Sequence, residues 1–146
     1  MKYVHTNIVA KDWRKLAQFY IDVFECEPIL PEKNIRGEWF EKISNIKDVE
    51  LEGIHLQLPG YSKNGPTLEI FQYNQQIRIE KKLNQSGFAH IAFSTSELKK
   101  TLKIALAHGA QQVGEVVEKS FEKLGKITAV YLKDPEGNII ELQHWE

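Results

Sequence analysis

Residues 4–21 read VHTNIVAKDWRKLAQFYI, and residues 89–106 read AHIAFSTSELKKTLKIAL. Both stretches begin with a histidine in a short alternating apolar run, continue through an acidic residue, and end in apolar residues at helical spacing. The alternation predicts a strand, and the i, i+3, i+4 spacing predicts an amphipathic helix. The same order of elements therefore occurs twice, and an internal repeat constrains more of the fold than a local motif does.

A second pair of related stretches closes the two halves. Residues 67–73 read TLEIFQY and residues 139–145 read IIELQHW, so Glu69 and Glu141 take equivalent places. β-Branched and aromatic runs at 49–58 and 127–133 predict a further strand before each of these. We therefore expect an α+β fold in a single domain over 1–146, made of module 1–74 and module 87–146 joined by a linker at 75–86.

The composition limits the class of protein. A chain of 146 residues with 42% hydrophobic content suits one compact domain. The 19 Lys and Arg and the 20 Asp and Glu are interspersed and give a net charge of −1, so we expect neither a nucleic acid nor a membrane as partner. Cys26 is the only cysteine and cannot form an internal disulfide. These features predict a cytoplasmic protein.

Strand alternation separates two faces. On one parity the strands carry apolar residues that can pack on the helices. The other parity mixes polar and aromatic residues, which predicts a wet cavity lined by strands. Its members are His5, Asn7, Glu69, Phe71, Tyr73, His90, Ala92, Ser94, Glu141, Gln143 and Trp145.

The segment over residues 31–48 has no persistent period. Gly37, Trp39 and Phe40 lie among charged residues there. We expect a long loop over the cavity.

The motifs TLEIF at 67–71, GFAHIAF at 87–93 and KDPEGNIIEL at 133–142 resemble the vicinal oxygen chelate superfamily (glyoxalase, bleomycin resistance protein and dioxygenase), with closest similarity to its glyoxalase I-type metal-binding members. The resemblance implies two βαβββ modules that form a pseudo-twofold half-open barrel. It also implies one divalent metal ion held by His5, Glu69, His90 and Glu141.

The chemistry of this ligand set agrees with the resemblance. Two imidazoles and two carboxylates suit Zn²⁺, Ni²⁺, Co²⁺ or Mn²⁺. The other histidines are left out of the set. His55 lies on a strand as a cavity or surface residue, His108 is better interpreted as a cation at a helix C-terminus, and His144 lies on the parity away from Glu141.

The resemblance further implies a metal-dependent lyase or isomerase that transfers a proton through a metal-stabilised enediolate or enolate, as lactoylglutathione lyase does. Glu141 is the expected base and Glu69 its catalytic partner. Trp39, Phe71, Tyr73 and Arg36 are candidate substrate-binding residues for a small molecule, and the superfamily also implies a homodimer.

Two features leave the substrate open. Bacterial glyoxalase I enzymes commonly carry Arg and Asn where this chain has Val9 and Tyr73, and methylmalonyl-CoA epimerases usually carry Gln where it has Glu69. A methylmalonyl-CoA epimerase-like enzyme is one alternative. A non-catalytic protein that binds an antibiotic or other small molecule, of the bleomycin-resistance type, is another.

Overall fold

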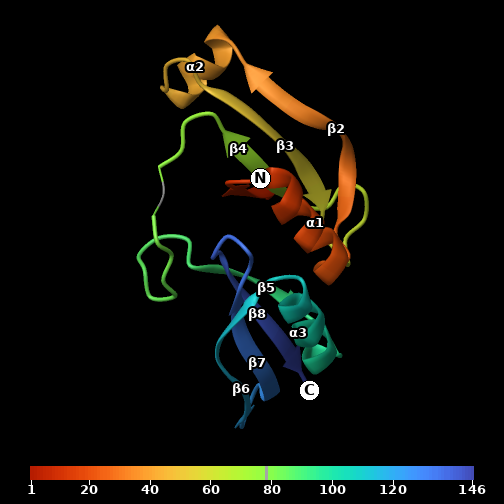
Figure 1. Cartoon of the computed structure of the whole chain (residues 1–146). Helices are drawn as coiled ribbons and strands as arrows, with labels where there is room; N and C mark the ends of the chain where they lie inside the picture. Colours follow the sequence, from red (N-terminus) through yellow and green to blue (C-terminus); the bar gives the residue numbers. More distant parts are fainter. Residues whose placement is uncertain (78) are drawn as a thin grey trace. The chain divides into compact units, whose positions relative to one another are not determined.

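A computed structural model describes residues 1–77 and 79–146 (Figure 1). Residue 78, within the linker expected at 75–86, lies outside the described residues. The contacts between residues divide the chain into two units, Met1–Arg78 and Ile79–Glu146. Each unit is described by itself below.

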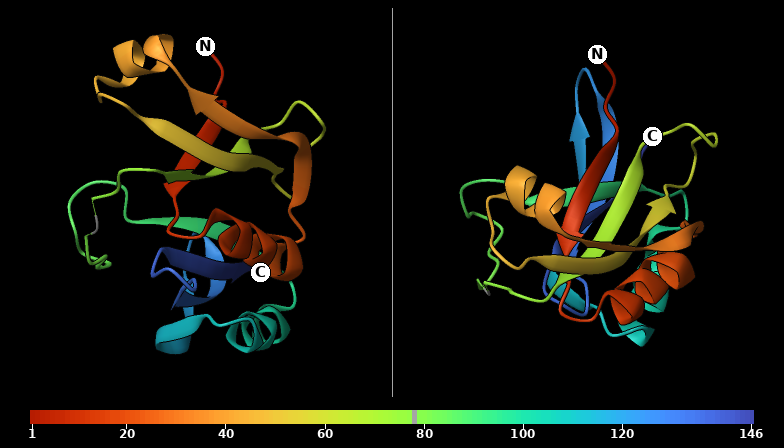
Figure 2. Two further views of the ribbon diagram at one scale, coloured as in Figure 1. Left: turned by 45° about the horizontal axis from the view of Figure 1, so that its top comes forward. Right: turned by 90° about the horizontal axis from the view of Figure 1, so that it is seen from above.

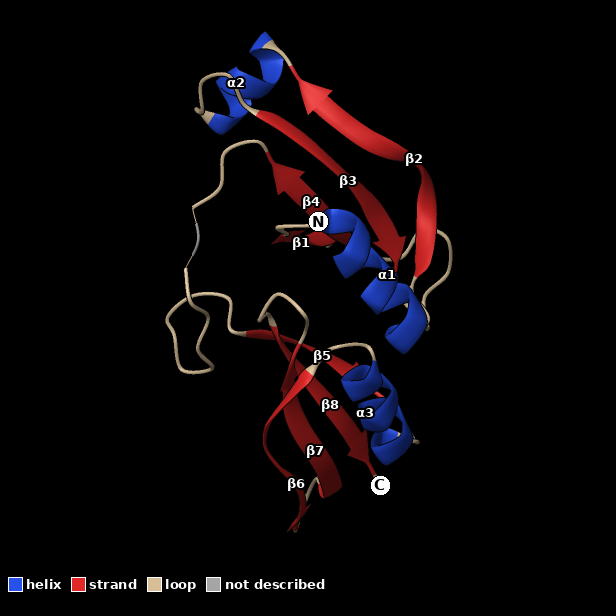
Figure 3. Cartoon of the chain, viewed as in Figure 1, coloured by secondary structure: helices blue, strands red, loops and turns tan. Residues whose placement is uncertain are grey.

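The first unit contains four strands and two helices (Figure 3). Its sheet has the order β1-β4-β3-β2, in which β1 is parallel to β4 and the other pairs are antiparallel. The elements are β1 (His5–Val9), α1 (Trp13–Phe24), β2 (Glu27–Arg36), α2 (Glu38–Ser44), β3 (Glu50–Gln57) and β4 (Thr67–Tyr73).

The second unit repeats this plan. Its sheet has the order β5-β8-β7-β6, with β5 parallel to β8 and the other pairs antiparallel. The elements are β5 (His90–Ser94), α3 (Leu98–Ala107), β6 (Gln111–Phe121), β7 (Gly125–Lys133) and β8 (Ile139–Trp145). The predicted α+β class and the two similar modules are therefore confirmed, and each sheet is open.

The core of the first unit lies between α1 and one face of its sheet (Figure 2). Asp12 caps the helix by accepting a hydrogen bond from the backbone N–H of Lys15 at 3.2 Å. The helix buries an apolar stripe of Trp13, Leu16, Ala17, Phe19, Tyr20, Val23 and Phe24. The sheet residues buried on this face are Ile8, Ile54, Leu56, Leu68 and Ile70.

The second unit has a smaller core of the same kind. α3 buries Leu98, Leu102 and Ala105, and the sheet contributes Val130, Leu132, Ile140 and Leu142. The ring Nδ1 of His108 lies 2.9 Å from the carbonyl oxygen of Ile104, and so gives a hydrogen-bond partner to one of the last carbonyl groups of α3.

Two parts of the chain differ from the sequence prediction. The prediction of a long loop at 31–48 is wrong, because the end of β2 and the helix α2 occupy most of that segment. Strand β6 covers a segment to which the sequence analysis assigned no element. β2 and β6 are edge strands with almost wholly exposed side chains, and α2 buries none of its residues. Without a buried face, such elements leave no hydrophobic period to detect.

Within residues 1–77 and 79–146, every helix is too short or too polar to span a bilayer.

Candidate functional site

The imidazole of His5 and the carboxylate of Glu69 lie together in the first unit. The parallel pairing of β1 with β4 sets His5 beside Thr67 and Asn7 beside Glu69. His5 Nδ1 is 3.4 Å from Glu69 Oε1, and Asn7 Nδ2 donates to Glu69 Oε2 at 3.3 Å. Glu69 is only 8% exposed, and a buried carboxylate requires polar partners of this kind.

His55 joins this group from the neighbouring strand. The antiparallel pairing of β3 with β4 places His55 directly opposite Glu69. His55 Nε2 lies 3.1 Å from Glu69 Oε1, and His55 Nδ1 lies 3.4 Å from the hydroxyl oxygen of Thr67. Burial lowers the pKa of His55, although the negative charge of Glu69 opposes the shift. We therefore expect an uncharged imidazole at neutral pH.

His55 lies outside the ligand set predicted from the sequence, and the turn after its strand gives only an approximate signal for its partner. The strands that carry His55 and Glu69 flank the turn region at residues 59–66. Centring an antiparallel hairpin on that turn places His55 opposite Ile70, one position from Glu69, whereas the structure pairs His55 with Glu69. Alternation within one strand could not reveal the partner, because it assigns a face and not a register.

The second unit builds a related group around Glu141. The pairing of β5 with β8 sets His90 beside Ile139 and Ala92 beside Glu141, and His90 Nε2 is 3.1 Å from Glu141 Oε2. Tyr131 lies opposite Glu141 on β7, and its ring meets the His90 ring edge-on at 5.2 Å. Burial raises the pKa of Tyr131, and the charge of Glu141 and a hydrogen bond to it add to the shift. The Tyr131 hydroxyl therefore belongs to the surroundings of the Glu141 carboxylate.

The two groups of side chains occupy equivalent positions in the strand register of their sheets. In both units the histidine of the first strand lies diagonally across from the glutamate of the last strand, and a third side chain lies opposite that glutamate. The third side chain is His55 in the first unit and Tyr131 in the second.

The predicted metal ligands thus occur as one His–Glu pair in each unit. Among the described residues, no group of three or more His, Cys, Asp and Glu side chains is arranged to hold a metal ion. The four-ligand set takes two residues from each unit, and it stays a prediction.

Phe71 borders the Glu69 group, and Tyr73 connects its strand to α2. Phe71 is buried, and its ring meets the His55 ring edge-on at 5.6 Å. The Tyr73 ring stacks on Phe40 at 6.3 Å, and burial, with the charge of Glu69 adding, raises the pKa of Tyr73. Trp39 touches Phe40 at 5.6 Å between ring centroids but is 60% exposed. The structure therefore brings Phe71, and not Trp39, to the polar group.

Gly53 makes room for Phe71. It lies opposite Phe71 across β3 and β4. A Cβ atom at Gly53 would lie 2.3 Å from Phe71 Cδ1 and 2.2 Å from the carbonyl oxygen of Ile70. The absence of a side chain at Gly53 leaves room for the Phe71 ring, which lies beside His55.

Arg36 ends β2, where it pairs with Glu50 and is exposed. Strand alternation places it on the parity opposite Leu51 and Tyr73. The register therefore does not direct Arg36 to the face that carries Glu69, and its contact with a substrate stays a prediction.

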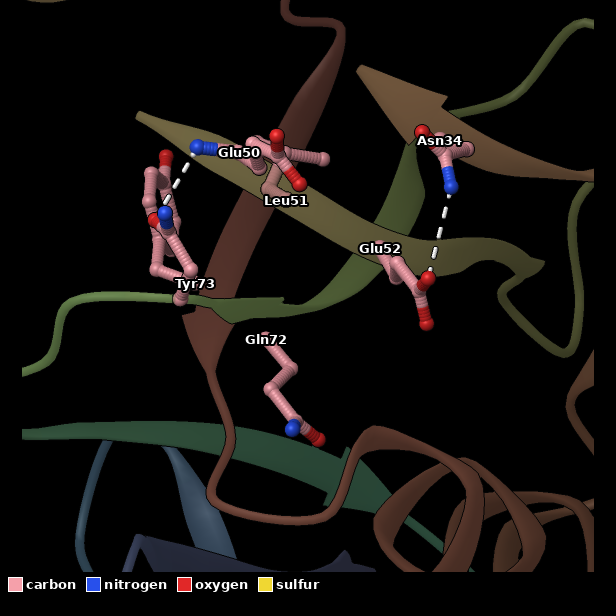
Figure 4. Close-up of a pocket in the computed structure, with 7 residues that line it drawn as sticks. Asn34, Glu50, Leu51, Glu52, Gln72 and Tyr73 are labelled. Carbon is pink, nitrogen blue, oxygen red and sulfur yellow. Dashed lines mark hydrogen bonds between the residues drawn. The ribbon is translucent and has the colours of Figure 1, made fainter. Parts of the chain in front are cut away.

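A polar cavity of about 270 Å³ lies at the Tyr73 end of the first sheet (Figure 4). Inside it, Asn34 Nδ2 donates to Glu52 Oε1 at 3.3 Å, and the backbone N–H of Glu50 donates to Asn74 at 3.0 Å. The cavity is lined by Asn34, Glu50, Leu51, Glu52, Gln72, Tyr73 and Asn74. Of the candidate site residues only Tyr73 belongs to this lining.

Comparison with known proteins identifies the family. The sequence model of the Glyoxalase/Bleomycin resistance protein/Dioxygenase superfamily matches residues 2–142. A glyoxalase family protein from Bacillus cereus is 19% identical, with a TM-score of 0.76 over 99% of this chain and 93% of that chain. A glyoxalase/bleomycin resistance protein/dioxygenase domain from Frankia is 15% identical, with a TM-score of 0.63 over 100% of this chain and 97% of that chain.

A virulence protein from Salmonella typhimurium is 20% identical, with a TM-score of 0.57 over 100% of this chain and 98% of that chain. A search of curated protein sequences found no match. The solved structures show the fold alone, whereas the family match spans almost the whole chain and confirms the resemblance drawn from the motifs around Glu69, His90 and Glu141. The chain belongs to the Glyoxalase/Bleomycin resistance protein/Dioxygenase superfamily.

Proposed function

We propose that this protein is a divalent-metal-dependent lyase or isomerase of the glyoxalase I type. The observation that carries the proposal is the repeated pair of side chains, His5 with Glu69 at 3.4 Å and His90 with Glu141 at 3.1 Å, built by one register in both units. Members of the superfamily typically bind a divalent metal ion. The four side chains would hold it, and their nitrogen and oxygen donors suit Zn²⁺, Ni²⁺, Co²⁺ or Mn²⁺.

The bound ion would supply a positive charge that stabilises negative charge developing on neighbouring substrate oxygens. The chain supplies the proton transfer. We assign Glu141 as the base: its carboxylate breaks the C–H bond next to a carbonyl by taking the proton, and returns that proton to the same carbon or its neighbour. Tyr131, opposite Glu141 on β7, supplies a hydroxyl beside this carboxylate. Glu69 is the corresponding carboxylate of the first unit and the second catalytic candidate.

The substrate class follows from this chemistry. A compound with a hydrogen next to a carbonyl is required, such as a small carbonyl compound, a thioester or a hemithioacetal. Phe71 offers an apolar surface beside His55, and Tyr73, Trp39 and Arg36 complete the proposed contacts with the substrate. A homodimer and a cytoplasmic location belong to the same proposal.

Exchange of the substrate α-hydrogen with deuterium oxide tests the function directly. Protein purified without chelator is mixed with methylglyoxal hemithioacetals and with acyl-CoA thioesters, and exchange is followed by proton NMR. We expect loss of the α-hydrogen signal, abolition of exchange after chelator treatment, and recovery when the metal is restored. A metal-loaded protein that binds these compounds without exchange would favour the small-molecule-binding protein.

A further inference from the structure

We propose that His55 is a positioning residue that, together with Asn7, holds the Glu69 carboxylate in one orientation. Glu69 then serves as a fixed metal ligand, and Glu141 remains the carboxylate that is free to move a proton. This inference rests on the proposed function, because it divides the work of the two carboxylates at the proposed metal site. It adds a residue that lies outside the four-ligand set.

The direction of the hydrogen bond follows from the chemistry of the two groups. An ionised carboxylate can only accept, so His55 Nε2, 3.1 Å from Glu69 Oε1, must carry the proton that is donated. Nδ1 of the neutral ring is then an acceptor, and it lies 3.4 Å from the Thr67 hydroxyl, which can donate. Thr67 thus favours the tautomer that Glu69 requires.

Both oxygens of Glu69 are engaged by neutral donors. His55 reaches Oε1 from β3, and Asn7 reaches Oε2 from β1 at 3.3 Å. β4 is hydrogen-bonded to both of these strands, so the backbone ladder fixes the two donors on either side of the carboxylate. A carboxylate held at both oxygens loses most of its rotational freedom.

The second unit lacks half of this arrangement. Ala92 takes the place of Asn7 beside Glu141 and has no donor, while Tyr131 takes the place of His55. The side chain of Glu141 is also more exposed than that of Glu69, at 16% against 10%. The less restrained and more accessible carboxylate is therefore the one assigned to proton transfer.

A matched pair of variants tests the role of His55 through metal binding. His55→Tyr installs the donor that the second unit uses, and His55→Phe has nearly the same bulk without a hydroxyl. Cobalt(II) chloride is titrated into chelator-treated parent, H55Y and H55F proteins, and affinity is measured by competition with a chelator. His108→Gln, at the end of α3, is the control for loss of a histidine, and circular dichroism verifies that each variant is folded.

We expect H55F to lower Co²⁺ affinity about 10- to 100-fold, the usual effect of removing a partner that orients a metal ligand. H55Y should bind more tightly than H55F, H108Q should match the parent, and Glu69→Ala should abolish the difference between the two His55 variants. Equal affinities of H55F and H55Y in the parent background would overturn the proposal. A Co²⁺ absorption spectrum showing that the parent loses a nitrogen ligand in both variants would also overturn it, because His55 would then bind the metal itself.

The tautomer of His55 gives a second readout that needs no metal. Nitrogen-15 NMR of the chelator-treated parent should show the proton on Nε2 at neutral pH, and a proton on Nδ1 would contradict the arrangement. A parent that binds no Co²⁺ would remove the proposed function first. A parent that binds Co²⁺ while H55F and H55Y behave alike would remove only the role of His55.

Discussion

His55 and Tyr131 take the same place in their two units, each directly opposite the glutamate of the last strand. The histidine ring nitrogen lies 3.1 Å from Glu69, and the tyrosine bears a hydroxyl on the strand position paired with Glu141. The repeat therefore keeps a hydrogen-bond donor opposite each carboxylate and changes the chemistry of the donor. The carboxylates differ in their surroundings although their backbone settings match.

The first prediction concerns metal content. We expect about one divalent ion per chain in protein purified without chelator, and His5→Ala and His90→Ala each to lower the metal content strongly, because each removes one of the four proposed ligands. Elemental analysis measures the ratio, with His144→Ala as the control. Retention of parental metal content by folded H5A and H90A proteins would refute the ligand assignment.

The second prediction concerns the base. Glu141→Gln keeps an oxygen donor but removes the basic carboxylate, so turnover should fall roughly 10²–10⁴-fold with a smaller loss of metal. The α-hydrogen exchange assay measures the rate, and Glu115→Gln on the exposed strand β6 serves as the control. If E141Q exchanges as fast as the parent, the base lies elsewhere, and Glu69 is the next candidate.

The third prediction concerns the space beside the site. Gly53→Ala places a Cβ atom against Phe71 and the Ile70 carbonyl, so β3 or β4 must shift. We expect the free energy of unfolding to fall by roughly 1–3 kcal/mol, as for other overpacked positions. Urea denaturation measures the change. Ala129→Gly, the reverse exchange at the corresponding position of β7, should cost only about 0.5–1 kcal/mol. Equal denaturation midpoints for G53A and the parent would contradict the prediction, because the Phe71 ring would then move aside with no loss of stability.

The fourth prediction concerns pH. Burial raises the pKa of Cys26 from 9.0 to about 12. The folded chain therefore holds the thiol proton more tightly than the unfolded chain, so this stabilising contribution is complete below pH 9 and is lost as the pH rises toward 12. The free energy of unfolding should fall by up to about 1.4 kcal/mol per pH unit from this group in that window.

Comparison of the parent with Cys26→Ala isolates this slope from those of other groups that titrate in the same range. A thiol reagent at pH 8 provides a faster check, since the folded parent should react slowly and the urea-unfolded parent rapidly. Rapid labelling of the folded protein would contradict the burial of Cys26.

The fifth prediction concerns assembly. Each open sheet ends in edge strands, such as β2 and β6, whose free backbone groups favour pairing or cover. Members of the superfamily commonly form dimers, and the exposed edge strands agree with this, so we expect a homodimer. Light scattering at micromolar concentration measures the mass, and a monomer alone would remove this prediction while leaving the proposed ligand set to the metal analysis.

The sequence predicted the elements that have a buried face and missed those that do not. β4 was predicted at its observed bounds, Thr67–Tyr73, because Leu68 and Ile70 alternate against the core. β2 carries Pro28 and Pro31 on an exposed edge, where proline is tolerated and no alternation marks the strand. β6 is exposed along most of its length for the same reason.

For the site, the repeat predicted which residues are equivalent but not which neighbours meet. His5 and Glu69 were identified because His90 and Glu141 match them in the other half of the sequence. His55 has no such match, since Tyr131 stands in its place, and a comparison of the halves discards it. Only the strand register reveals that His55 and Tyr131 each lie opposite a glutamate.

The shared register of the two sheets gives each side chain around one glutamate an equivalent position around the other. Asn7→Ala combined with His55→Tyr would rewrite the first unit in the pattern of the second without removing a main-chain hydrogen bond. Because the two units share one backbone ladder, any difference between Glu69 and Glu141 must come from the side chains beside them.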